Sequence, residues 1–185
     1  MEHYLNTPIK TTDLQNLKIG DKIYLSGTIY TGRDAAHKRL IALLEEGKTL
    51  PFPIKGAAIY YVGPAPTPPG KVIGSAGPTT SYRMDSFTPK LLDVGLKIMI
   101  GKGPRNEEVR KSMLKNKAVY LVAIGGAAVV MSRTIKKAEV IAYDDLGTEA
   151  IHKLEVENFP CIVANDLQGN DIFEQGVKKF KQKNR

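Results

Sequence analysis

The sequence predicts an α/β domain in which helices pack against a central sheet, and three segments lead to this prediction. Residues Lys22–Tyr30 alternate apolar and polar side chains, which is the period-two pattern of a half-buried strand. Residues Asp34–Glu46 carry apolar side chains at helical spacing and stop at Gly47, a residue favoured just past a helix end. Residues Ala118–Ile124 are apolar enough for an interior strand. Strands and helices that alternate along a chain are typical of layered α/β domains.

The remaining segments continue this alternation and leave the strand order open. A loop at residues 63–70 holds four prolines and therefore cannot belong to a regular element. A helix is expected at Asn106–Lys115, because Val109, Met113 and Leu114 would share one face. The other expected elements are strands at Ala57–Val62, Lys71–Gly74, Lys97–Ile100, Ala138–Ala142, Lys153–Glu157 and Cys161–Ala164, a turn at 165–170 and a short helix at Ile172–Phe180.

Length and hydropathy favour one domain over residues 1–185 that ends in a basic tail at 181–185. The longest apolar run is interrupted by Gly125 and Gly126 and is shorter than the roughly 20 residues of a membrane-spanning helix. Residues 1–10 lack the basic flank and apolar core of a secretory signal. We therefore expect a cytoplasmic protein with no membrane segment.

The single cysteine, Cys161, limits the metal chemistry that this chain can support. One thiol cannot form an internal disulfide, a zinc site of several thiolates or the three or four ligands of an iron–sulfur cluster. Any cluster would need ligands from another chain. Because Cys161 lies in the apolar segment 159–163, a buried structural thiol is expected.

The net charge of +8 does not by itself indicate a nucleic-acid partner. Five basic residues crowd the last eight positions, and a terminal tail of this kind is usually solvated. The sequence holds no zinc finger, no aromatic RNA-binding signature and no basic region with heptads. We expect no nucleic acid among the partners.

Four glycine-containing turns, at 31–34, 74–80, 101–103 and 125–126, each follow an expected strand. Ligands of α/β sheets bind at such strand ends, where glycine allows close approach and free amides attract anions. Arg33, Arg83 and Lys102 add positive charge at or beside three of these turns. Any one of these turns could be only a turn whose cation faces water. Together they favour an anion site.

A dicarboxylate fits these cations better than a nucleotide does. The loop at 101–104 lacks the spacing of a phosphate-binding loop, and Asn106 stands where a dinucleotide fingerprint needs its third glycine. The planar fork of arginine matches a carboxylate with two hydrogen bonds. Two arginines and one lysine therefore suit a substrate with two carboxylates.

Two polar residues lie beside Arg33 along the expected helix. His37, one helical turn later, could steady a ligand or a neighbouring subunit, or it could serve packing or lie at the surface. Asp34 is favoured as the residue that caps the helix through its side chain. No metal-ligand spacing links His37 with His3 and His152, and His152 is expected to be structural.

Several longer motifs follow one another along the sequence. They are Gly32-Arg33-Asp34-Ala35-Ala36-His37, Tyr60-Tyr61-Val62-Gly63-Pro64-Ala65, Gly77-Pro78-Thr79-Thr80-Ser81-Tyr82-Arg83-Met84-Asp85, Gly101-Lys102-Gly103, Gly125-Gly126-Ala127-Ala128 and Val156-Glu157-Asn158-Phe159-Pro160. Together they resemble class I fumarate hydratase. The match is to its C-terminal domain, which in two-component members and in the related L-tartrate dehydratases is a separate beta subunit, and it extends from about Lys10 to Phe173.

The resemblance implies a swivelling β/β/α domain with a central mixed sheet and flanking helices. It also implies a larger alpha subunit whose four-iron, four-sulfur cluster sits on three cysteines and binds substrate through an open iron, in an assembly of two alpha and two beta subunits. The implied reaction is the reversible hydration of fumarate to (S)-malate. Dehydration of L-tartrate, and a non-catalytic anion-binding or regulatory module, remain open alternatives.

The same resemblance assigns roles to individual residues. Arg33, Arg83 and Lys102 would bind the substrate carboxylates, and Thr79 would be the catalytic base. His37, Asp34 and Thr80 would support them. A threonine hydroxyl is a poor base, so Thr79 would need a nearby cation such as Arg83 to favour its alkoxide. Ser81 and Tyr82 stand where family members often hold small residues and are expected to alter the shape of the pocket.

Overall fold

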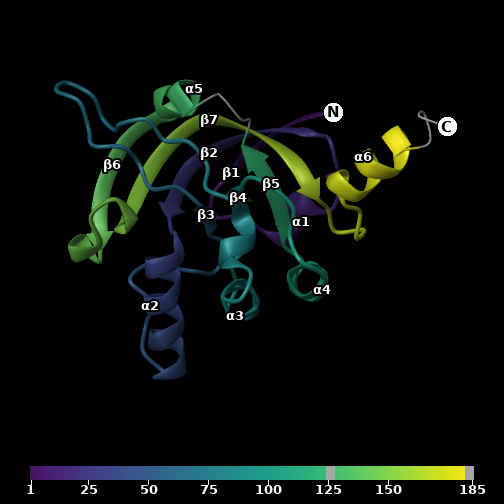
Figure 1. The fold of residues 1–185 in the computed structure, drawn as a ribbon, viewed down its shortest axis with the longest axis horizontal. Helices are drawn as coiled ribbons and strands as arrows, with labels where there is room; N and C mark the ends of the chain where they lie inside the picture. Colours follow the sequence, from purple (N-terminus) through teal and green to yellow (C-terminus); the bar gives the residue numbers. More distant parts are fainter. Residues whose placement is uncertain (124–127, 182–185) are drawn as a thin grey trace.

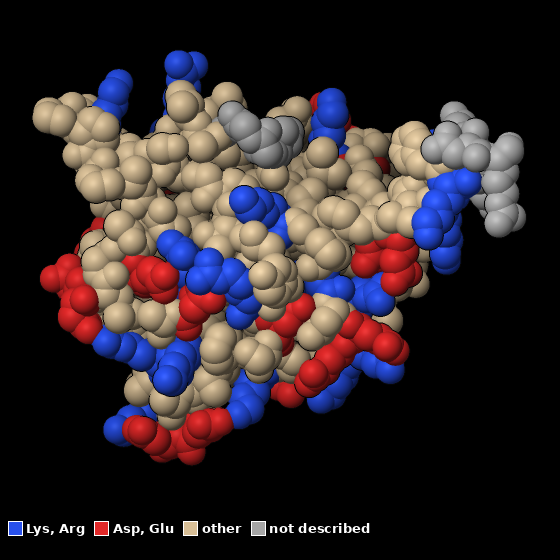
Figure 2. All heavy atoms as spheres, in the orientation of Figure 1, with Lys and Arg blue, Asp and Glu red and all other residues tan. Residues whose placement is uncertain are grey.

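The computed structural model describes residues 1–123 and 128–181, which form a mixed α/β fold (Figure 1). Charged side chains of both signs are interspersed over the same face (Figure 2). Within these residues the strands of one mixed sheet are β1 (Glu2–Asn6), β2 (Lys22–Thr31), β3 (Ala58–Tyr60), β4 (Ile98–Gly101), β5 (Val119–Ala123), β6 (Ile135–Ala142) and β7 (Ile151–Asn165). The helices are α1 (Thr11–Leu14), α2 (Asp34–Glu45), α3 (Thr88–Asp93), α4 (Glu107–Asn116), α5 (Ala128–Thr134) and α6 (Ile172–Lys181), with short 3-10 helices η1 (Ser81–Met84) and η2 (Asp144–Glu149).

The strand pairings connect five strands into a closed ring. Strands β2, β3, β4 and β5 pair in parallel one after the other, and β7 runs antiparallel to both β5 and β2. Strand β1 joins the first half of β2, and β6 joins the first half of β7. Because β2 to β5 are parallel, their carboxyl ends meet at one edge of the sheet.

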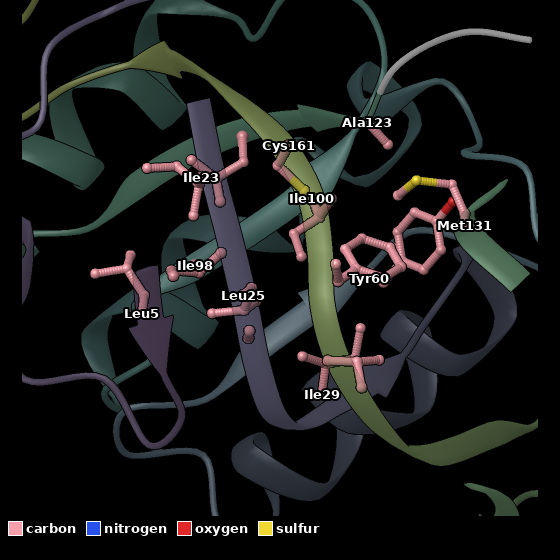
Figure 3. Close-up of a cluster of buried hydrophobic side chains, with 14 of the residues drawn as sticks. Leu5, Ile23, Leu25, Ile29, Tyr60, Ile98, Ile100, Ala123, Met131 and Cys161 are labelled. Carbon is pink, nitrogen blue, oxygen red and sulfur yellow. The ribbon is translucent and has the colours of Figure 1, made fainter. Parts of the chain in front are cut away.

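Two apolar cores lie on the two sides of the parallel strands. The first fills the ring with side chains from β1 to β5 and β7 that point toward one another, together with Met131 of α5 (Figure 3). The second lies between the strands and α2, α3 and α4, which hang below the sheet in Figure 1. Within β3, Ala58 and Tyr60 enter the first core and Ile59 enters the second. Burial on both faces is why these strands are almost continuously apolar.

Most expected elements are present close to their predicted bounds. The strand expected at Ala118–Ile124 is observed as β5, up to Ala123, and the C-terminal helix is α6. The turn at Gly125–Gly126 and positions 182–185 of the basic tail lie outside the described residues. No helix among the described residues is both long and apolar enough to cross a membrane.

The strand predicted at Lys71–Gly74 is wrong. The segment is part of a proline-rich loop that folds back on itself, with the amide of Ala65 donating to the carbonyl of Ser75 at 3.0 Å. Gly74 lies so close to the backbone of Ala65 that a Cβ atom would come within 2.2 Å of its carbonyl oxygen. The segment therefore packs against its own loop, and Val72 is left exposed.

The two strands predicted at Lys153–Glu157 and Cys161–Ala164 are one strand, β7, of 15 residues. A bulge lies at Glu157 and Asn158, because these two residues of β7 lie opposite Ser26 alone, while Phe159 and Pro160 pair regularly with β2. Asn158 takes a positive φ of 52° there, and its amide donates to the hydroxyl of Ser26 at 3.0 Å. The bulge keeps both halves of β7 paired with β2.

Candidate functional site

The candidate loops meet at the carboxyl edge of the parallel strands. Strand β2 runs into Arg33, and β4 runs into Lys102. The loop at 79–81 joins this edge through the backbone, since the amide of Thr79 donates to Tyr61 at 2.6 Å and the amide of Ser81 donates to Lys102 at 2.9 Å. The amide of Lys102 donates back to Thr79 at 3.3 Å, and Thr80 forms an isolated parallel bridge with Lys102. Thr79 and Lys102 therefore stand on neighbouring backbones.

Arg83 is oriented by Asp34. Its Nε donates to Asp34 Oδ1 at 2.9 Å, and its Nη2 lies 2.9 Å from Oδ2, so the carboxylate faces one side of the guanidinium. Both side chains are partly exposed. The pair leaves the edge formed by Nη1 and the second Nη2 hydrogen for another carboxylate, because a guanidinium offers five donors in a fixed plane.

Arg33 lies against the turn after β3. Its Nη2 is 3.3 Å from Glu149 Oε1, and both side chains are mostly buried. A Cβ atom on Gly63 would come within 2.8 Å of Arg33 Nη1, so glycine is what lets the guanidinium lie on this backbone. Arg33 Nε is buried and has no hydrogen-bond partner among the described residues.

The prediction that Asp34 caps α2 through its side chain is wrong. The N-cap is Arg33, in an extended conformation and without a side-chain cap, while Asp34 is the first helical residue. Its carboxylate pairs with Arg83, and the amide of Ala35 donates instead to Glu149 Oε2 at 3.1 Å. The Arg83 guanidinium offers this carboxylate two nitrogen donors and an opposite charge.

His37 lies in the first turn of α2 and is fully buried. Its Nδ1 lies 2.8 Å from the carbonyl oxygen of Arg33, so this nitrogen carries the proton and donates. Burial lowers the pKa of His37 to about 4, and the ring is therefore neutral at physiological pH. The ring also packs edge-on against Tyr61. This buried environment favours a packing role for His37 over contact with a neighbouring subunit.

Sequence reasoning missed a buried ion pair beneath these loops. Arg105 Nε donates to Asp85 Oδ1 at 2.6 Å, and Asp85 Oδ2 accepts from the amide of Asn106 at 2.9 Å. The Arg105 guanidinium also donates to the hydroxyls of Thr88, at 2.7 Å, and Tyr61, at 3.3 Å. The pair thus ties the segment that carries Arg83 to the segment that carries Lys102. Asp85 is the last residue of one motif and Arg105 follows shortly after another, but no sequence pattern indicated that they would be buried.

A second buried contact joins the same two segments. Ser81 Oγ lies 2.8 Å from the hydroxyl of Tyr120, which donates to the carbonyl oxygen of Gly103 at 2.8 Å. A Cβ atom on Gly101 would come within 2.0 Å of Ser81 Oγ, so only glycine permits this approach. Ser81 therefore packs inward and does not shape a pocket, contrary to expectation, whereas Tyr82 is exposed.

Comparison with known proteins decides the family. The sequence profile described as "Fumarase C-terminus" matches residues 2–176. The chain belongs to the fumarase C-terminus family. It is 46% identical over 179 residues to an anaerobic class I fumarate hydratase of Escherichia coli K12, covering 95% of this chain and 33% of that protein. It is 43% identical over 175 residues to the mitochondrial fumarate hydratase 1 of Leishmania major, covering 92% of this chain and 32% of that protein.

A shorter relative has nearly the same length as this chain. The L(+)-tartrate dehydratase subunit beta of Escherichia coli K12 is 35% identical over 188 residues, covering 99% of this chain and 92% of that subunit. By contrast, the chain spans only about a third of the length of the fumarate hydratases that it matches. The match of this member of the fumarase C-terminus family thus covers nearly all of the tartrate dehydratase beta subunit but only one part of each fumarate hydratase.

The described residues of this fumarase-family chain do not fit an iron–sulfur cluster. They contain no group of three or more His, Cys, Asp and Glu side chains that could hold a metal ion. Cys161 is 2% exposed inside the strand ring (Figure 3), where burial raises the pKa of its thiol. A buried neutral thiol of this kind is a packing residue.

The charge at the sheet edge is only partly balanced. Arg33 faces Glu149 and Arg83 faces Asp34, whereas Lys102 is exposed and forms no ion pair within residues 1–123 and 128–181. Figure 2 shows basic side chains in the middle of the face that carries α2 and α3, with acidic side chains beside them. Three cations and two carboxylates leave one net positive charge, which suits an anion.

Proposed function

We propose that this chain is the beta subunit of an iron–sulfur hydro-lyase that interconverts fumarate and (S)-malate in the cytoplasm. Its role is to bind the substrate carboxylates, while an alpha subunit carries the four-iron, four-sulfur cluster, with two copies of each chain in the assembly. The observation that carries this proposal is the gathering of Arg33, Arg83, Lys102 and Thr79 at one edge of the sheet. The family membership supports it.

The chemistry explains why cations are needed there. Dehydration of malate removes a proton from one carbon and hydroxide from the next, so negative charge builds on the carboxylate beside the first carbon. Positive groups that are already oriented toward this carboxylate stabilise the transition state without reorganising. Asp34 orients Arg83 in this way. The open edge of the Arg83 guanidinium matches a carboxylate with two hydrogen bonds.

Thr79 is the proposed base. Its backbone amide donates to Tyr61 and its carbonyl oxygen accepts from Lys102, so its backbone is held at the sheet edge. A threonine hydroxyl needs a nearby positive charge to lose its proton at neutral pH. Lys102, on the adjacent backbone, and Arg83, four residues along the loop, are the groups proposed to supply it.

Dehydration of L-tartrate is the second candidate, because the tartrate dehydratase beta subunit matches this chain over nearly its whole length. Both substrates carry two carboxylates, so the same three cations serve either one. The extra hydroxyl of tartrate would need a hydrogen-bond partner, which Tyr82 at the exposed rim or the alpha subunit could provide.

The test is to reconstitute the chain anaerobically with its alpha subunit and to assay dehydration of (S)-malate and of L-tartrate. We expect turnover of malate by the complex and none by either chain alone. Faster turnover of tartrate would favour the second candidate. Binding of malate without turnover of either substrate would instead indicate a non-catalytic anion-binding module.

A further inference from the structure

Glu149, the last residue of η2, contacts the start of α2 from another part of the chain. Its Oε1 lies 3.3 Å from Arg33 Nη2, and its Oε2 accepts a hydrogen bond from the amide of Ala35 at 3.1 Å. Only 23% of its side chain is exposed. One carboxylate thus serves both the side chain of Arg33 and the helix that Arg33 begins.

The position of Arg33 explains why this contact is needed. A helix leaves its first amides without partners, and a Ser, Thr, Asp or Asn at the N-cap usually supplies one. Here the N-cap is Arg33, which has no acceptor to offer. Glu149 supplies the acceptor from the segment between β6 and β7, and its negative charge also suits the positive end of the helix.

We propose that Glu149 is a positioning residue that holds the Arg33 guanidinium in the orientation that binds a substrate carboxylate. This inference rests on the function proposed above, because it requires Arg33 to bind substrate. Arg33 is confined between Gly63, where a Cβ atom would touch Nη1 at 2.8 Å, and the segment that ends in Glu149. The carbonyl oxygen of Thr148 borders the same space, at 3.0 Å from that Cβ position.

A carboxylate beside a substrate cation has two opposing effects. It repels the substrate anion, and it removes the freedom of a flexible arginine before binding. The repulsion is weakened because Glu149 is already neutralised by Arg33 and by the helix amide. Ordering one long side chain before binding changes a binding equilibrium by roughly 3- to 10-fold. We therefore expect the ordering of Arg33 to outweigh the repulsion between Glu149 and the substrate.

The first test uses Glu149→Gln in the reconstituted complex. Glutamine keeps the length and can still accept from the amide of Ala35, but it loses the charge that holds Arg33. We expect KM for malate to rise roughly 3- to 10-fold with little change in kcat. The matched control is Asp145→Asn, which removes another η2–α2 ion pair, with Arg39, away from the sheet edge. It should leave KM unchanged.

A double variant separates positioning from structural support. If Glu149 acts through Arg33, adding Glu149→Gln to Arg33→Met should produce no further rise in KM. Equal effects in both backgrounds, or a lower KM in Glu149→Gln alone, would overturn the inference. If Arg33→Met itself leaves KM and kcat unchanged in an assembled complex, the carboxylate-binding role proposed for Arg33 fails instead.

The second test is independent of activity. In the full chain, the Arg33 Nε hydrogen is buried, so its exchange with water, followed by NMR of 15N-arginine, should be slow. Glu149→Gln should accelerate this exchange, whereas Asp145→Asn should not. Unchanged exchange in Glu149→Gln, with an unchanged melting temperature, would show that Gly63 alone holds Arg33 and would overturn the inference.

Discussion

At the scale of single residues, the site is built from arginines that are oriented by carboxylates of the same chain. Asp34 occupies one side of Arg83, and Glu149 holds Arg33. The Arg83–Asp34 pair is partly exposed, so it contributes only about 0–1 kcal/mol to stability. The effect of both pairs on the site lies in the direction that each guanidinium takes.

The first prediction concerns Arg83→Lys. Lysine keeps the charge but cannot face Asp34 and a substrate carboxylate in one plane, so the substrate contact should weaken. A charged hydrogen bond contributes about 1.5–3 kcal/mol, so its loss in the transition state should lower turnover of malate roughly 10- to 150-fold. Steady-state assay of the complex measures this, and the melting temperature should change little because the pair is exposed.

Lys102→Met is the companion variant, expected to raise KM by removing the cation that has no ion pair among the described residues. Normal kinetics of both variants in a correctly assembled complex would remove Arg83 and Lys102 from the site. A large loss of melting temperature would assign them to the fold.

The second prediction follows from His37. The folded protein keeps this ring neutral down to about pH 4, whereas an unfolded chain protonates it near 6.5. Between these values the unfolded state binds more protons, so the free energy of unfolding should fall as the pH is lowered, by up to about 3 kcal/mol. Urea unfolding at pH 7.0 and 4.5 measures the loss. His37→Gln should reduce this pH dependence, and an equal loss in the variant would contradict the assignment.

At the scale of elements, the candidate loops at the sheet edge depend on a buried scaffold. Arg105 lies between the rings of Tyr61 and Tyr120 and is 4% exposed, while Asp85 accepts from both the Arg105 side chain and the start of α4. The loop that carries Arg83 and the loop that carries Lys102 are therefore one unit, joined below the surface.

The third prediction is that Arg105→Met destabilises the fold strongly. It leaves the Asp85 carboxylate buried without its partner, which costs about 3–5 kcal/mol. Chemical unfolding of the chain measures this loss. Replacing both partners, as in Arg105→Met with Asp85→Leu, should recover part of the stability because no charge is left buried. If the single variant unfolds like the native chain, the pair does not support the loops.

Helices and strands whose apolar side chains recur with a clear period were predictable from the sequence, and those that depend on tertiary contacts were not. The alternation in β2 and the apolar face of α4 are local signals, and both elements formed near their expected bounds. The sequence predicted two strands in place of β7, because Asn158 and Pro160 are residues that usually interrupt a strand. In the structure, β7 pairs with β2 on both sides of the bulge, so it continues as one strand. Helix α3 and strand β1 are short and gave no signal that could be told from a loop.

The candidate site was predictable in the same uneven way. Arg33, Arg83 and Lys102 stand in or beside glycine turns after strands, so topology alone could bring them to one edge. Glu149 and Asp85 could not be found this way, because each acts on a residue distant in sequence. Glu149 is 116 positions from its partner Arg33, and no periodicity links the two.

At the scale of the whole molecule, the charge at the sheet edge falls short of what a dicarboxylate needs. The proposed substrate carries two negative charges, whereas Arg33, Arg83 and Lys102 are opposed by Asp34 and Glu149. The fumarate hydratases that this chain resembles are about three times as long, which leaves room for further binding groups outside the matched region. This charge balance is a further reason for the proposal above that an alpha subunit completes the binding site.

The last prediction is therefore that the isolated chain binds malate weakly and acquires full affinity only on assembly. A few exposed ion pairs, each contributing about 0–1 kcal/mol, give a Kd of about 1 mM or weaker. Isothermal titration with malate should detect tight binding only for the anaerobic complex with the alpha subunit, and size-exclusion chromatography should give one hetero-oligomeric peak. The pure chain should be colourless and free of stoichiometric iron, since its one cysteine is buried inside the strand ring. Tight binding of malate, or hydratase activity, by the chain alone would show that the complete site lies here, and separate elution of the two chains would show that the alpha subunit is not its partner.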